Sequence, residues 1–127
     1  MIPYIEITRK GAVRKTRRQN IWDGTALVGT ITVSYARLIR VFGEPTSEGD
    51  WIKMDACWEI LTPEGPATIY NWKDGGNYLG DGGLAVEDIE EWHIGGFSPE
   101  VIPWIIDALH ISPSSAVYAH ITPIAQT

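Results

Sequence analysis

The chain has 127 residues, a formal net charge of −6, six tryptophans and one cysteine. A chain of this length buries roughly two-thirds of its unfolded surface, so it can fold without a metal or a disulfide. The single cysteine, Cys57, excludes an intramolecular disulfide and suits a reducing compartment. No run approaches the roughly 18 apolar residues of a membrane-spanning helix. We therefore expect one cytoplasmic domain over residues 1–127, without a membrane.

The charge is unevenly distributed. Residues 1–18 carry a net charge of +5, whereas residues 19–127 carry −11. The acidic body repels nucleic-acid phosphates, so any contact with RNA or DNA is expected to come from the basic N-terminal part.

The first predicted strand covers residues 2–8, with Tyr4 on one face and Ile5 and Ile7 on the other. The basic run at residues 9–18 follows, and we interpret it as a solvated arm or hairpin loop. The alternative is a surface that grips RNA, DNA or an acidic protein, because clustered cations stabilise nearby anions. Its candidate binding residues are Arg14, Lys15, Arg17 and Arg18.

Residues 26–33 are rich in Val, Ile and Thr, which predicts a second strand. A helix is expected directly after it. Ser34 can cap its N-terminus, apolar residues recur at helical spacing as far as Phe42, and Gly43 ends it.

The central predicted element is a β-hairpin over residues 51–73. Residues 51–60 alternate, with Trp58 and Ile60 on one face and Cys57 and Glu59 on the other. Proline and glycine at residues 62–66 predict the turn, and β-branched and aromatic residues at 67–73 predict the second strand. Within this hairpin we expect Cys57 to be a packed side chain, not a reactive thiol.

The glycine-rich run at residues 74–84 is expected to be a surface loop, because its aspartates do not match a calcium-binding loop. Residues 91–94 predict another strand, which leads to a second helix capped by Ser98. Residues 116–121 are expected to add an edge strand or to contact a partner subunit. The elements predict an α+β domain: a mainly antiparallel sheet of about five strands with two helices on one face.

Two sets of residues are candidates for ligand binding. Gly95 and Gly96 precede a helix N-terminus, where free backbone N–H groups attract anions, and His93 and Ser98 can add donors. Most tryptophans are expected in the core, but an aromatic wall can also stack on a base or form a protein-binding hot spot. The candidates for this wall are Tyr70, Trp72 and Tyr78.

The sequence contains no recognised catalytic or metal-binding pattern. His93, His110 and His120 lack the spacing of a metal-binding helix, and no G-x-S-x-G or H-E-x-x-H motif occurs. The carboxylate pairs at residues 87–88 and 90–91 are expected in an exposed segment, not in an acid/base dyad. We therefore predict a binding protein without cofactor or metal, and not an enzyme.

Four blocks between residues 30 and 110 resemble a group of small, uncharacterised proteins of tailed phages. The blocks are Tyr35-x-x-Leu38-x-x-x-Phe42-Gly43-x-Pro45, Trp58-Glu59-Ile60, Thr68-Ile69-Tyr70-Asn71-Trp72-Lys73 and Glu91-Trp92-His93-Ile94-Gly95-Gly96. Where the family pattern reads acid-x-Tyr-Lys, this chain has Asp50-Trp51-Ile52-Lys53. The resemblance brings no catalytic residues, and the basic run lies outside it.

The resemblance implies an antagonist of host defence that acts in the cytoplasm of the host cell. In one mechanism, similar to that of an anti-CRISPR protein, the chain binds and blocks a nucleic-acid-guided effector, so its partner is a host defence protein or ribonucleoprotein. In a second mechanism it is a sponge that sequesters a nucleotide signal. A third alternative is a small hydrolase that uses His93 and neighbouring carboxylates. A homodimer is compatible with each.

Overall fold

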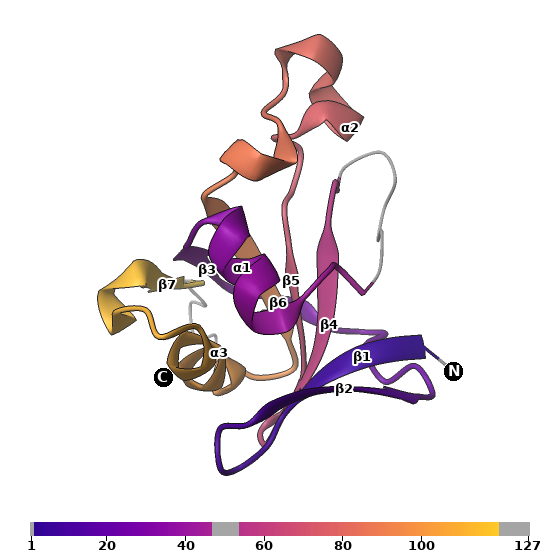
Figure 1. The fold of residues 1–127 in the computed structure, drawn as a ribbon, viewed down its shortest axis with the longest axis vertical. Helices are drawn as coiled ribbons and strands as arrows, with labels where there is room; N and C mark the ends of the chain where they lie inside the picture. The colour runs from indigo at the N-terminus through magenta and orange to yellow at the C-terminus, as the bar shows by residue number, and fades with distance from the viewer. Residues whose placement is uncertain (1, 47–53, 120–127) are drawn as a thin grey trace, which may run out of the picture.

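The computed structural model describes residues 2–46 and 54–119, apart from the side chains of Ile2 and Arg18. Within these residues seven strands form one sheet in the order β2-β1-β4-β5-β6-β3-β7, and α1 and α3 pack on one of its faces (Figure 1). The strands are β1 (Ile2–Ile7), β2 (Val13–Arg18), β3 (Ala26–Thr32), β4 (Cys57–Thr62), β5 (Gly65–Tyr70), β6 (Glu91–Gly96) and β7 (Ala116–Tyr118). The helices are α1 (Tyr35–Phe42), α2 (Gly76–Leu79) and α3 (Val101–Leu109), with short 3₁₀ turns η1 (Gly80–Gly82), η2 (Val86–Asp88) and η3 (Pro113–Ser115).

The α+β class is confirmed, but the sheet differs in detail from the prediction. It is mixed, because β1 pairs in parallel with β4; the other strand pairs are antiparallel. The prediction of about five strands was too low because β2 was assigned to an arm and β7 was only one of two alternatives for the tail. No helix within the described part of the chain is long and apolar enough to cross a membrane.

The basic run is an ordered hairpin with an edge strand. Thr8 N–H donates to the Ala12 carbonyl (2.8 Å) and closes the turn, where Gly11 adopts a φ of 85°. β2 then pairs with β1 over its whole length, and Arg14 forms an ion pair with Glu6 (2.6 Å). The interpretation of residues 13–18 as an arm or loop was therefore wrong, because pairing with β1 supplies the hydrogen bonds that a solvated arm would take from water.

The central hairpin is confirmed, with shorter strands than predicted. β4 and β5 are the third and fourth of the seven strands, and the turn between them consists of residues 63 and 64. The residues before β4 are not a strand, because Asn71 Oδ1 accepts the N–H groups of Asp55 (2.6 Å) and Ala56 (3.1 Å). Trp51 and the rest of the predicted first arm up to residue 53 lie outside the described residues.

The core between the sheet and the helices is built on two tryptophans. Trp58 and Trp92 are fully buried, and their rings meet edge-on with centroids 5.4 Å apart. Each indole N–H donates to a backbone carbonyl: Trp58 to Gly43 (2.9 Å) and Trp92 to Val33 (3.1 Å). These bonds satisfy the polar atoms of two side chains that supply much apolar area, as the sequence predicts for a domain of this size. Trp51 is the predicted core tryptophan that lies outside the described residues.

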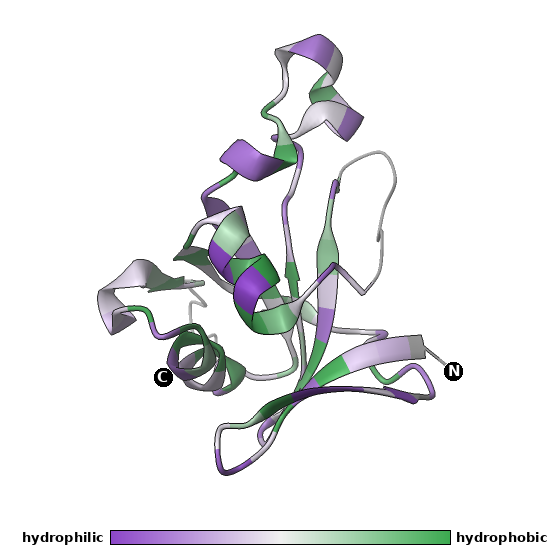
Figure 2. Ribbon diagram, in the orientation of Figure 1, coloured by the Kyte–Doolittle hydropathy of each residue, from purple (hydrophilic) through white to green (hydrophobic). Residues whose placement is uncertain are grey.

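The two packed helices follow from their sequence signals, with one shift. Ser34 Oγ accepts the Arg37 N–H (3.1 Å) and caps α1 as predicted. α3 begins at Val101, three residues after Ser98, whose hydroxyl instead accepts the Glu100 N–H (3.2 Å). Figure 2 shows α3 mostly in the colours of hydrophobic residues, which matches its burial against the sheet.

The glycine-rich run is not only a loop, because it contains α2 and η1. The Asp55 carboxylate accepts the Asn77 N–H (3.3 Å) and so stabilises the first turn of α2. The described residues therefore contain three helices where two were expected, and α2 is the additional one. In the tail, β7 confirms the predicted edge strand as far as Tyr118; His120 and the residues after it lie outside the described residues.

Candidate functional site

Three of the predicted binding residues form an aromatic cluster, which we define as Tyr70, Trp72 and His93. Tyr70 and His93 are paired neighbours on β5 and β6, with ring centroids 5.4 Å apart. The Trp72 ring lies 6.1 Å from that of Tyr70. Side chains alternate between the faces of a sheet, and the preceding pair Ile69 and Ile94 is buried in the core. The cluster therefore lies on the face of the sheet that α1 and α3 do not cover.

The aromatic cluster lines a shallow pocket. Leu27 and Met54 complete its wall, and its volume is about 270 Å³. Leu27 is 46% exposed although it belongs to β3. The apolar atoms and three rings suit a flat or aromatic group better than a chain of phosphates.

A larger acidic pocket adjoins the aromatic cluster and shares Trp72 and His93 with it. Its volume is about 620 Å³. Carboxylates dominate its polar lining, and the Asp74 carboxylate also accepts the side-chain N–H of Asn71 (3.0 Å). Negative charge at this position repels phosphates and attracts ammonium and guanidinium groups. The carboxylate residues that line it are Asp74, Asp88, Glu90 and Glu91.

The structure separates the glycine pair from the helix N-terminus. Gly95 and Gly96 are buried in β6 and are paired with β5 on one side and with β3 on the other. Four residues lie between Gly96 and the start of α3. A Cβ on Gly95 would approach the Thr68 hydroxyl within 2.5 Å, so close packing explains this glycine. The predicted anion site, with Ser98 as its helix cap, is therefore not formed. Its two glycines are paired inside the sheet and do not lie at the N-terminus of α3.

The predicted cations lie on β2, at the edge of the sheet. Lys15 lies over the C-terminus of α1, since its Nζ would be 2.7 Å from a Cβ built on Gly43. Arg14 is held by Glu6 on the opposite side of the strand, Arg17 is exposed, and the backbone of Arg18 completes β2. β1 and β4 lie between β2 and β5, so the basic strand and the aromatic cluster are about 14 Å apart across the sheet. They form two separate surfaces.

A small polar pocket of about 250 Å³ contains the cysteine and a buried carboxylate oxygen. Burial raises the pKa of the Cys57 thiol to about 12, with a further contribution from Glu59. Burial also raises the pKa of Glu59, and the charge of Asp23 adds to this. Glu59 Oε1 has no hydrogen-bond partner in the described part of the chain. A thiol with so high a pKa is protonated at neutral pH and is a poor nucleophile, which agrees with its prediction as a packed side chain.

Within residues 2–46 and 54–119, no group of three or more His, Cys, Asp or Glu side chains has a geometry that could hold a metal ion. His93 belongs to the aromatic cluster, and His110 lies 17 positions away at the end of α3.

No known protein family, curated protein or solved structure matches this chain. The sequence did not single out Leu27 and Met54 as site residues, because an isolated apolar residue near a strand end is normally read as core. The alternation of β3 was the available signal for Leu27, since Leu27 and Val28 must point to opposite faces.

Proposed function

We propose that this chain is a non-catalytic binding protein that antagonises a host defence system by binding and blocking a nucleic-acid-guided effector. The observation that carries the proposal is the separation of charge in the fold. Residues 74–91 contain six carboxylates and no Lys or Arg, whereas residues 9–18 contain six of the ten Lys and Arg residues. In Figure 1 the segment around α2 and the turn between β1 and β2 lie at opposite ends of the long axis.

We call residues 74–91 the acidic end; it carries negative charge on a folded backbone, as a nucleic acid carries it on its phosphates. An effector that holds a guide and a target needs a channel lined by Lys and Arg, and carboxylates on a folded surface compete for those cations. The neighbouring rings add cation–π contacts. Lys73 of this chain already shows such contacts, because its Nζ lies 5.4 Å from the centre of the Tyr78 ring and 5.9 Å from that of Trp72.

The two alternative functions have less support at these surfaces. A nucleotide sponge at the aromatic cluster would bring phosphates next to the carboxylates of the acidic pocket, which costs Coulomb energy. The hydrolase alternative uses His93 and neighbouring carboxylates, which line the acidic pocket together, but the sequence has no catalytic motif that assigns them a role. Blocking of an effector requires neither a bound phosphate group nor a catalytic side chain. The resemblance to tailed-phage proteins is consistent with a role in the host cell.

A phage infection assay tests the proposal. Host cells that carry a nucleic-acid-guided defence against a phage are expected to lose their protection when they express this chain. The variant Asp88→Asn, Glu90→Gln, Glu91→Gln should restore protection, because it removes three exposed charges from the acidic end. The control variant Glu64→Gln, Glu100→Gln changes exposed carboxylates elsewhere and should act like the wild type. Equal activity of both variants would contradict the role of the acidic end.

A further inference from the structure

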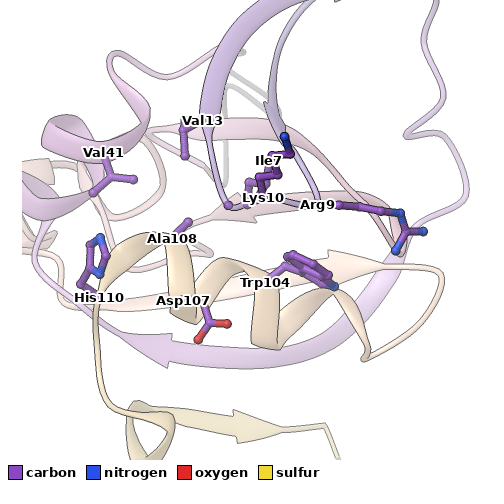
Figure 3. A pocket seen from close by; sticks show the side chains of 10 residues that line it. Ile7, Arg9, Lys10, Val13, Val41, Trp104, Asp107, Ala108 and His110 are labelled. Carbon is purple, nitrogen blue, oxygen red and sulfur yellow. The ribbon is translucent and has the colours of Figure 1, made fainter.

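A pocket of about 590 Å³ lies between the turn of the basic hairpin and α3. Figure 3 shows Trp104 and Ala108 on the side of α3 that faces Lys10 and Ile7. Arg9 and Lys10 supply the positive charge, and His110 lies at the end of α3. Its other lining residues are Gly11, Val13, Val41 and Asp107.

The composition of this pocket fits a nucleotide. Its volume lies in the range of small-molecule sites, and its aliphatic wall and the half-buried Trp104 ring offer a surface on which a base can stack. Arg9 and Lys10 are exposed cations at the same pocket, and such groups bind phosphate oxygens strongly. The Asp107 carboxylate can accept a hydrogen bond from a base amino group or a sugar hydroxyl.

The positive charge continues from the pocket along β2. Val13 lines the pocket, and residues two apart on a strand point to the same face. Lys15 and Arg17 therefore follow Val13 on that face, at intervals of about 7 Å. Lys15 lies beside Gly43, which follows Val41 of the pocket wall by two residues. A ligand longer than one nucleotide would meet these two cations next.

We infer that this pocket binds one nucleotide of a single-stranded nucleic acid, with its base against Trp104 and its phosphate at Arg9 and Lys10. The neighbouring phosphates follow Lys15 and Arg17 along β2. This surface is separate from the acidic end, so the inference does not depend on the proposed antagonism of host defence. A base-stacking residue was absent from the basic run in the sequence, and the fold supplies one from α3.

Fluorescence anisotropy of labelled single-stranded RNA and DNA of about 12 nucleotides tests the inference. The wild-type chain should bind, and affinity should fall steeply as salt rises from roughly 50 to 200 mM. The double variant Arg9→Ala, Lys10→Ala should bind about tenfold or more weakly, and its salt slope should be smaller by about one, because the two cations hold one phosphate. Arg40→Ala removes an exposed cation of α1 that does not line the pocket, and it should bind like the wild type.

Trp104→Ala tests the stacking step and should weaken binding roughly tenfold with little change in the salt slope. Trp104→Phe keeps a ring for packing and stacking, and should recover most of the affinity. Circular dichroism of each variant checks that it is folded. Absence of oligonucleotide binding by the folded wild type would overturn the inference, as would equal losses in the pocket variant and in Arg40→Ala. Cyclic nucleotides and mononucleotides that bind as tightly as the oligomers would also overturn it, because the track along β2 would then contribute nothing.

Discussion

Asn71 joins the end of β5 to two carboxylates, and its replacement by Asp gives a sharp test of the structure around the aromatic cluster. Asn71 is fully buried, and its Nδ2 donates to Asp55 Oδ1 (2.9 Å) and Asp74 Oδ1 (3.0 Å). Asn71→Asp keeps the shape but replaces these donors by an acceptor. Hydrogen bonds to charged groups contribute about 1.5 kcal/mol each at the low end of their range, which suits half-exposed carboxylates. The expected loss is about 3 kcal/mol, or roughly 10 °C in Tm for a chain of this size.

The loss in Asn71→Asp should depend on pH. Burial and two neighbouring carboxylates raise the pKa of the new carboxyl in the folded state above its unfolded value. The destabilisation is therefore largest at neutral pH and decreases as pH falls through that raised pKa. Thermal unfolding followed by circular dichroism at several pH values measures this. Asn20→Asp is the matched control, because the exposed Asn20 also donates to a carboxylate, that of Asp23 (3.0 Å). A Tm loss of Asn71→Asp no larger than that of the control would refute the reasoning.

Three further predictions concern buried groups on either side of the sheet. Burial raises the pKa of Glu59 in the folded state, so the folded state loses stability as pH rises above the pKa of an unfolded-chain glutamate, about 4.3. Glu59→Gln should therefore have a higher Tm than the wild type at pH 7 and the same Tm well below pH 4.3. Cys57, with a pKa of about 12, should react with iodoacetamide at pH 8 at least roughly 100-fold more slowly than a free thiol, and denaturant should remove the difference; fast labelling of the folded chain would contradict its burial. Gly29→Ala should cost about 2 kcal/mol in chemical denaturation, since a Cβ there would lie 2.7 Å from the Val117 carbonyl oxygen, whereas Gly76→Ala meets open space and should cost less than about 1 kcal/mol.

Local sequence signals were sufficient for elements whose residues face the core with a clear period. α1 is an example, because Ser34 and Gly43 mark its ends and Leu38 and Phe42 are its buried residues. β2 is the opposite case. Most of its side chains are charged or polar, and what makes it a strand is the pairing with β1. A strand at the edge of a sheet has little apolar pattern, so periodicity cannot distinguish it from a solvated run.

The candidate sites were predictable only in part. Tyr70, Trp72 and His93 were singled out from their chemistry, and the structure brings them together because β5 and β6 pair with Tyr70 opposite His93. The sequence contains no signal for the register of strands that lie twenty residues apart. The same reason explains Trp104, which was expected in the core. It is half-buried and lines a pocket together with Arg9 and Lys10, residues that are far from it in the sequence.

We propose that the acidic end of this fold occupies a cation-lined channel of a nucleic-acid-guided effector. The most direct measurement is binding of the purified chain to a panel of purified effectors by biolayer interferometry, at low and at physiological salt. At least one effector is expected to bind both the wild type and the control Glu64→Gln, Glu100→Gln. The variant Asp88→Asn, Glu90→Gln, Glu91→Gln should bind it tenfold or more weakly, by about 1.4 kcal/mol or more. Binding of that variant with undiminished affinity, or no binding of the wild type to any effector, would contradict the claim.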